Sequence, residues 1–316
     1  MAVPSQGWIE AALAAAGHSP DHELTRIPPL LLPVTAHRLA VCAALAGCRP
    51  EHYPVVAAAV GALDHPELNT LGVLTTTGSA AFALWVNGPA GPRLGFNAGV
   101  NLLGPGSRAN ATVGRALSLA TRILAGARQG VGDLATMGQP GKYTLAFAEN
   151  EAESPWEPFH VERGFAPSDS TLTVIGVAGT DEVVDAWAVS AEEIIAVLGH
   201  ALVGCAGTVI HGDGTLGGGQ PVLLISPEWA ARLDADGVGK ADLCSRLAAA
   251  AQTSADRVPA SALRGVEAEG AALPEVLRVV ASADDLLIVV AGGVGLKQAI
   301  LPNWNGRSRA VTVPLA

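Results

Sequence analysis

The chain has 316 residues, of which 49% are hydrophobic and 15% are charged, and its formal net charge is −10. This composition excludes a disordered, collagen-like or coiled-coil protein, and the negative charge with no basic cluster argues against nucleic acid as a partner. A chain of this length exceeds what one ordinary core fills, so we expect two domains or one domain built from two similar halves.

No apolar run reaches the roughly 18 residues that a membrane helix needs, and the first 17 residues carry Glu10 but no basic leader. We therefore expect a cytoplasmic protein with no membrane partner. The four cysteines, Cys42, Cys48, Cys205 and Cys244, are few and scattered, which indicates reduced thiols and no disulfide framework.

Residues 1–37 are predicted to form an N-terminal extension. Shortly after it, Cys48 lies between Gly47, which can end a helix, and Pro50, which suits the start of the next one. A helix N-terminus and the adjacent Arg49 would both lower the pKa of the thiol. Cys48 is therefore the candidate nucleophile, with the nearby Glu51 as a further catalytic candidate. The alternative is that Cys48 is a small buried hydrophobe.

Matching strand and helix patterns occur twice along the chain. Phe82–Leu94 and Pro221–Leu233 each read as an apolar strand, a turn and the start of a helix. Each is followed by a loop with glycine and by a second helix, for which Asn110 and Asp242 are the expected N-caps. The chain is therefore expected to contain a weak internal duplication.

Two later segments extend this comparison. Ser168–Gly179 and Ser282–Gly293 are both β-branched runs that end in glycine, which is typical of strands. The repeated order of helices and strands predicts an α/β fold made of two pseudo-symmetric α/β halves with mixed sheets. We place the halves at residues 38–185 and 186–316.

A glycine-rich turn at residues 104–107 leads directly into the helix expected near Asn110. Such a turn at a helix N-terminus, with Arg108 beside it, could hold a carboxylate or a phosphate. Arg108 and Asn110 are therefore candidate substrate-binding residues, although a turn of this kind can also simply reverse the chain.

Residues 137–165 form a segment that we expect only in the first half, as an active-site insert. Carboxylates close to a histidine can act as a general acid/base pair, so Glu151 and His160 are assigned to proton transfer. Interleaved prolines and aromatic residues predict a partly buried segment that forms a wall of the main pocket. The candidate substrate-binding residues in the insert are Lys142, Tyr143, Glu149, Trp156, Glu157 and Arg163. The spacing fits no established metal signature, so no metal ligand is assigned.

At four motifs the chain resembles a bacterial family found beside or fused to UGSC-family (seleno)proteins. The motifs are AGCRPEHYPVV, GPGSRANATVGRAL, GKYTLAFAENEAESPWEPFHVERGF and VVAGGVGLKQAILPNW. The resemblance runs from about Arg38 to Leu315. It implies that family motif positions include Cys48, Arg49, Glu51, Arg108, Asn110, Lys142, Glu149, Asn150, Glu151, Trp156, Glu157, His160, Glu162 and Arg163. The UGSC-family proteins are named for a motif of selenocysteine or cysteine followed by Gly-Ser-Cys. This chain has no Cys-Gly-Ser-Cys motif, so a redox dyad would have to come from another polypeptide.

These observations favour a thiol-dependent enzyme of the lyase, transfer or redox type that acts on a small anionic or carbonyl-bearing metabolite without a cofactor. One alternative is a non-catalytic large subunit that binds a small thiol or selenol protein. Another is a metal-dependent lyase or hydrolase that uses the cluster between Glu149 and Glu162. Besides the substrate, the expected partners are a second copy of the chain or the small thiol or selenol protein.

Overall fold

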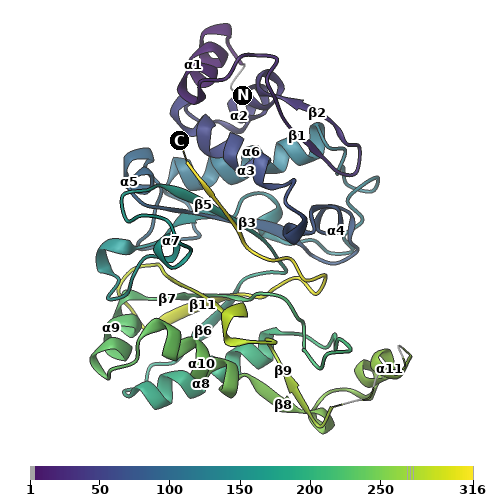
Figure 1. Ribbon diagram of the computed structural model, residues 1–316, viewed down its shortest axis with the longest axis vertical. Coiled ribbons are helices and arrows are strands. Elements are labelled where there is room, and N and C mark those ends of the chain that lie inside the picture. Colours follow the sequence, from purple (N-terminus) through teal and green to yellow (C-terminus); the bar gives the residue numbers. More distant parts are fainter. Residues whose placement is uncertain (1–3, 269, 271, 273, 316) are drawn as a thin grey trace.

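The computed structural model describes residues 4–268, 270, 272 and 274–315. Two four-stranded sheets lie between two layers of helices (Figure 1). The strands of the first sheet are β3 (Ala81–Asn87), β4 (Ala146–Ala148), β5 (Thr171–Val177) and β12 (Val311–Pro314). The strands of the second sheet are β6 (Asp181–Val184), β7 (Val222–Ile225), β10 (Leu287–Val290) and β11 (Lys297–Leu301).

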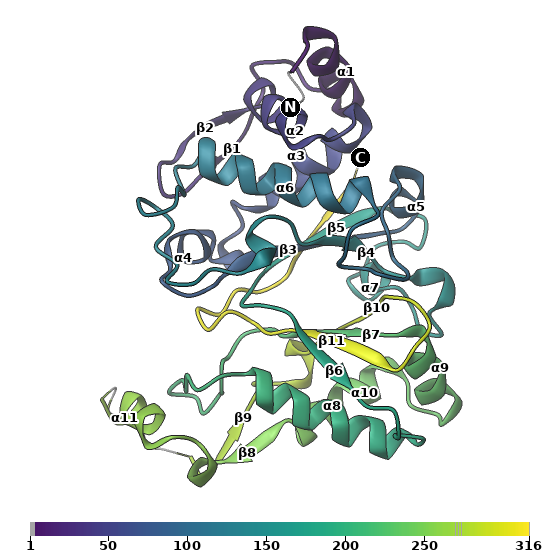
Figure 2. The same ribbon diagram turned by 180° about the vertical axis from the view of Figure 1, so that it is seen from behind.

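Helices cover the outer face of each sheet (Figure 2). Those over the first sheet are α1 (Gln6–Ala16), α2 (Ala36–Ala46), α3 (Tyr53–Ala62) and α6 (Arg108–Ile123). Those over the second sheet are α8 (Ala191–Cys205), α9 (Pro227–Ala235) and α10 (Lys240–Ala250). Smaller elements are the strands β1 (Glu23–Ile27), β2 (Leu32–Thr35), β8 (Gln252–Ser254) and β9 (Val276–Arg278), and the helices α4 (Thr70–Thr75), α5 (Ala90–Leu94), α7 (Phe159–Glu162) and α11 (Ala260–Ala268). None of the described helices is long and apolar enough to span a membrane.

The alternation of side chains along the strands explains the layers. On β3, Leu84 and Val86 pack with the helices above the first sheet, whereas Ala83 and Trp85 pack into a core between the two sheets. Successive side chains of a strand point to opposite faces, so a strand that is apolar at every position is suited to burial on both faces. The strands of the second sheet alternate in the same way between the core shared by both sheets and a core under α8, α9 and α10.

The two sheets have the same pattern of strand pairing, which confirms the α/β fold with mixed sheets. In the first sheet β3 pairs parallel with β4 and antiparallel with β5, and in the second β7 pairs parallel with β10 and antiparallel with β11. As expected, Phe82–Leu94 contains β3 followed by α5, and Pro221–Leu233 contains β7 followed by the start of α9. The duplication of the sequence itself stays a prediction.

The matching of Ser168–Gly179 with Ser282–Gly293 is wrong. The first segment contains β5, which is antiparallel to its neighbour β3, whereas the second contains β10, which is parallel to its neighbour β7. The strand in the position equivalent to β10 is β4. Because β4 lies within residues 137–165, this segment is no simple insert but supplies a strand of the first sheet.

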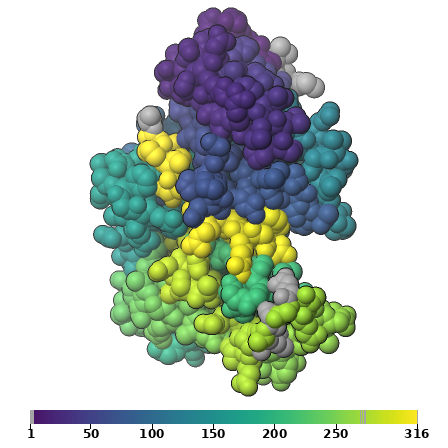
Figure 3. Space-filling model, turned by 45° about the vertical axis from the view of Figure 1, so that its right-hand side comes forward, coloured from purple at the N-terminus to yellow at the C-terminus, as the bar shows by residue number. Residues whose placement is uncertain are grey.

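The expected halves exchange their edge strands. β6 follows β5 along the chain but pairs with β11 in the second sheet, and β12 follows β11 but pairs with β5 in the first. In Figure 3 the C-terminal segment, in yellow, lies between the blue and the green parts of the chain. The N-terminal extension is also integrated, because Ile9, Leu13 and Val34 belong to the core beneath the first helical layer.

The N-caps of two helices differ from the expected ones. The hydroxyl of Ser107 accepts a hydrogen bond from the backbone N–H of Asn110, which makes Ser107 the N-cap of α6 and places Asn110 inside the helix. A side chain at the N-cap reaches the third residue of the helix, and this geometry selects Ser107. Likewise, α10 begins after Gly239, and Asp242 lies in its first turn.

Candidate functional site

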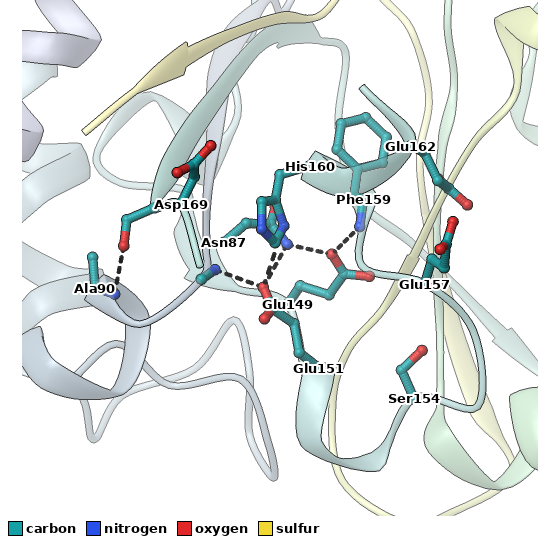
Figure 4. A network of polar contacts seen from close by, with 12 residues as sticks. Asn87, Ala90, Glu149, Glu151, Ser154, Glu157, Phe159, His160, Glu162 and Asp169 are labelled. Atoms are coloured by element: carbon teal, nitrogen blue, oxygen red, sulfur yellow. Dashed lines mark hydrogen bonds and ion pairs between the residues drawn. The ribbon is translucent and has the colours of Figure 1, made fainter. Parts of the chain in front are cut away.

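Polar side chains gather where β3 and β4 end, beside the end of β10 (Figure 4). The backbone N–H of Glu149 donates to the carbonyl oxygen of Val86 at 3.2 Å, and that of Asn150 donates to the carbonyl oxygen of Val290 at 2.8 Å. The parallel pairing of β3 with β4 brings their carboxyl ends to one edge, and such edges commonly hold the ligand sites of α/β proteins. The cluster therefore lies where the two sheets meet.

Asn87, the last residue of β3, links two carboxylates. Its side-chain nitrogen donates to Glu149 Oε2 and, at 2.8 Å, to Glu151 Oε1. The backbone N–H of Gly88 donates to Glu151 Oε1 at 2.7 Å, and that of Phe159 donates to Glu149 Oε2 at 2.8 Å. Backbone and amide donors thus fix both carboxylates at the strand ends.

Glu149 is buried, and burial raises its pKa to about 7. Desolvation disfavours the charged carboxylate, while the nearby Lys240 ammonium and the hydrogen bonds from Phe159 and Asn87 favour it. Desolvation is the larger effect. Glu149 therefore changes its protonation state close to neutral pH.

His160 is wholly buried and faces this pair of carboxylates (Figure 4). Its Nδ1 lies 3.8 Å from Glu151 Oε1, and neither ring nitrogen has a hydrogen-bond partner among the residues that the structure describes. The Glu151 side chain is 26% exposed. The structure therefore brings together Glu149, Glu151 and His160, three of the residues that the sequence predicted.

Lys240, the first residue of α10, joins the cluster from the second half. Its Nζ donates to Glu162 Oε2 at 3.0 Å and to the carbonyl oxygen of Glu157 at 3.3 Å, and it lies 3.9 Å from Glu149 Oε1. Burial raises the pKa of Glu162. Lys240 thus provides a buried positive charge that holds the segment around α7 against α10.

The other predicted residues of this segment lie around the cluster. Arg163 stacks over the Phe159 ring, with its guanidinium carbon 4.7 Å from the ring centroid, and burial lowers its pKa. The side chain of Trp156 is half-buried against the core of the second half. Glu157 is exposed and contributes its carbonyl oxygen to Lys240.

Cys48 differs from expectation. It is buried, its Sγ donates to the carbonyl oxygen of Thr112 at 3.3 Å, and burial raises its pKa to about 11. The nearby Arg108 favours the thiolate but does not outweigh desolvation. The expected lowering of the pKa is therefore wrong, and the segment after Cys48 is only a short 3-10 helix, Pro50–His52, that leads into α3. Cys48 packs in the core under the first helical layer, whereas Phe159 belongs to the core between the sheets.

Three further candidates, Glu51, Arg108 and Asn110, lie in the same part of the first half as Cys48. Glu51 is exposed, 3.9 Å from the exposed Arg49. Arg108 donates to the carbonyl oxygen of Gly47 at 3.0 Å. The buried Asn110 side chain hydrogen-bonds to the backbone of Asn97. Arg108 and Asn110 thus make structural contacts between loops and helices.

Lys142 and Tyr143 line a hollow of about 560 Å³ beside the C-terminal part of α6. Pro140, Lys142 and Tyr143 of the predicted wall line this hollow. The other residues expected at its surface do not line it: His160, Glu149, Glu151, Glu157 and Glu162. β4 separates the two places, because the hollow adjoins the residues before the strand and the carboxylates follow it. The predicted wall of the main pocket is therefore only partly correct.

Sequence reasoning missed Asn87 and Lys240 as site residues. A polar residue that ends the apolar run FALWV and precedes Gly88 was a signal for Asn87. Lys240 carried no local signal, because its contacts come from residues about 80 positions earlier in the chain.

Among the described residues, no group of three or more His, Cys, Asp or Glu side chains is placed to hold a metal ion. Comparisons of the chain with protein-family models, curated proteins and solved structures found no match.

Proposed function

We propose that the chain is an enzyme that transfers a proton on a small anionic or carbonyl-bearing metabolite, with Glu151 and His160 as its acid/base pair. The observation that carries this proposal is the state of His160, which is wholly buried, lies 3.8 Å from Glu151 and has no described partner for either ring nitrogen. A buried polar group without a partner is unfavourable by about 1–3 kcal/mol. A bound substrate that completes these hydrogen bonds would remove this cost.

The contacts of Glu151 suit a general base. Asn87 and Gly88 both donate to Oε1, which orients the carboxylate and leaves Oε2 for a substrate proton. The separation of 3.8 Å between Glu151 and His160 is too long for a hydrogen bond, but such contacts often shorten when substrate binds. Glu151 would take a proton from the substrate, and His160 would donate a proton of its own to another substrate atom or stabilise the developing charge. Exchange with solvent after product release would restore both groups.

Glu149 would support the pair through Asn87. Its pKa of about 7 means that it holds a proton for about half of the time near neutrality. The side-chain nitrogen of Asn87 joins the two carboxyl groups, so protonation of Glu149 would change the hydrogen bonds that orient Glu151. The buried Lys240 ammonium balances part of the negative charge of the cluster.

Cys48 has no place in this proposal, because a nucleophilic cysteine reacts as the thiolate and burial raises the pKa of Cys48 to about 11. The metabolite class stays the small anionic or carbonyl-bearing one that the sequence favours. The catalytic groups are the Glu151 carboxylate and the His160 imidazole.

Solvent isotope exchange tests the proposal. The purified chain is incubated in D₂O with a panel of 2-oxo, 3-oxo and 2-hydroxy carboxylates, and replacement of C–H by C–D is followed by NMR. We expect exchange faster than in a protein-free solution for at least one compound, a rate above that background lower by about 10²-fold or more in Glu151→Gln and His160→Gln, and no change in Cys48→Ser. Absence of any exchange above the background across the panel would overturn the proposal in favour of a non-catalytic subunit. Loss of exchange in Cys48→Ser alone would return the thiol to the mechanism.

A further inference from the structure

The hollow beside α6 is a second place where a small molecule can bind, independent of the proposed acid/base pair. Its lining includes three cations, Arg115, Arg122 and Lys142, and one carboxylate, Asp133. The whole chain carries a net charge of −10, so this local excess of positive charge is unlike the average surface. Clustered positive charge in a concave site attracts and concentrates anions.

The two arginines are available for a ligand. Arg115 and Arg122 are exposed, and neither guanidinium forms a hydrogen bond or an ion pair with a residue in the described part of the chain. They are seven residues apart on α6, so they share one face of the helix and lie about 10 Å apart along its axis. Such a spacing suits two anionic groups of one molecule better than a single compact anion.

The third cation, Lys142, lines the same hollow, and its backbone contacts α6. Lys142 forms an ion pair with Asp133 at 2.7 Å, and its backbone carbonyl accepts a hydrogen bond from Ser118 at 2.6 Å. Ser118 lies between the two arginines on α6, and it lines the hollow. Lys142 is therefore held in place beside α6, the helix that carries both arginines.

An apolar recess of about 100 Å³ adjoins the charged hollow. Its lining includes Leu74, Phe82 and Leu117, and it shares Ser118, Arg122, Asp133 and Lys142 with the hollow. Ligand sites commonly combine an apolar wall with a few polar groups that fix orientation. The recess would receive the carbon skeleton of a ligand whose charged groups contact the cations.

We infer that this hollow binds a small organic dianion, most simply a dicarboxylate, whose charged groups pair with Arg115, Arg122 and Lys142. Arginine binds carboxylates through paired hydrogen bonds, which gives both affinity and orientation. The hollow and the acid/base pair lie at opposite ends of β4, so the two sites can be tested separately.

Isothermal titration calorimetry of the full chain with succinate, glutarate and adipate tests the inference. Butyrate, which has a single carboxylate, and inorganic phosphate, which is a compact anion, are titrated for comparison. We expect saturable binding of at least one dicarboxylate, weaker binding of butyrate and phosphate, and affinity that falls as salt rises. Arg115→Gln and Arg122→Gln should each weaken binding by about tenfold or more. The matched control is Arg93→Gln, since Arg93 is exposed on α5 and does not line the hollow.

The variants must be shown to fold before the binding results are compared. Glutamine keeps helix propensity high, so the variants should retain the helical signal and Tm of the parent chain, and circular dichroism checks this. Failure of all three dicarboxylates to bind, preference for phosphate, or equal affinity in the α6 variants would overturn the inference. Glu151→Gln should bind the dicarboxylate as the parent does. Loss of binding in that variant would place the ligand at the acid/base pair.

Discussion

Cys48 and Glu149 are both buried, and burial raises the pKa of each because it disfavours the charged form. The consequences are opposite for chemistry. A raised pKa keeps the thiol of Cys48 protonated and inert at neutral pH, whereas it brings the carboxyl of Glu149 into the range where it can exchange a proton. At the residue scale, the same physical effect therefore weakens Cys48 as a candidate nucleophile and gives Glu149, expected only to bind substrate, a pKa suited to proton exchange.

Cys48 should react slowly with iodoacetamide. With a pKa of about 11, about one thiol in 10⁴ is ionised at pH 7. Burial raises the pKa of Cys244 to about 11 as well, but Cys244 is less buried, so we expect mass spectrometry to show slower labelling of Cys48 than of Cys244 in the folded chain and fast labelling of both after denaturation. Preferential labelling of Cys48 in the folded chain would contradict the raised pKa.

Glu149 should make stability depend on pH. Its folded-state pKa of about 7 exceeds the ordinary value of 4.5, so its contribution is fully present below about pH 4.5 and is lost as the pH rises through 7. The loss is on the order of 3 kcal/mol.

Urea denaturation at several pH values measures this dependence. Between pH 5 and pH 8 the free energy of unfolding should fall less in Glu149→Gln than in the parent chain. Glu10→Gln is the control, because Glu10 is exposed on α1. Equal slopes in Glu149→Gln and the parent would show that Glu149 ionises normally.

At the scale of elements, the turn between β3 and α5 positions the site. Gly88 has a φ of +75°, and a Cβ atom there would overlap the carbonyl oxygen of Asp169. Its N–H binds Glu151, and the preceding Asn87 binds both carboxylates. The end of β3, the start of β5 and the loop after β4 are therefore coupled through this one turn.

Gly88→Ala should destabilise the chain by more than about 2 kcal/mol, because it adds a steric overlap to an unfavourable φ. Gly95→Ala separates the two effects, since Gly95 has a φ of +74° and open space around its Cβ position. The Gly95→Ala control should lower the free energy of unfolding by about 1 kcal/mol. Urea denaturation measures the free energy of unfolding of both variants. Equal losses of stability would mean that the backbone near Asp169 shifts to make room for the added methyl group at little energetic cost.

At the scale of the whole molecule, two sheets share one core and exchange edge strands. Trp85 from the first sheet and Leu224 from the second pack in that core, and β6 and β12 each belong to the sheet of the other half. Neither half of the sequence therefore contains all the strands of one sheet.

Residues 1–185 and 186–316, expressed separately, should not fold. Each fragment would lack an edge strand and expose its side of the shared core, which is more apolar surface than a stable monomer leaves in water. Dispersion of amide NMR signals checks each fragment. The full chain should unfold in one transition, seen together by tryptophan fluorescence and far-UV circular dichroism. A well-dispersed spectrum from either fragment would contradict this.

Local patterns predicted a large part of the fold. Apolar runs such as FALWV and LIVV formed buried strands, and the strand–turn–helix order of Phe82–Leu94 recurs in Pro221–Leu233. The acidic segment before His160 was predicted to be a partly buried site, and Glu149, Glu151 and His160 do lie together. These features follow from periodicity and from the residues within a short stretch of chain, so sequence alone determined them.

Only the tertiary structure decided which strands pair, which edge strands are exchanged and which polar groups are buried. Sequence reasoning equated β5 with β10, because two apolar runs look alike whether they pair parallel or antiparallel. It also expected a lowered pKa for Cys48, because the flanking Gly47 and Pro50 do not reveal that α6 covers the thiol. Pairing and desolvation depend on contacts between residues far apart in the chain, and these exist only once the layers have packed.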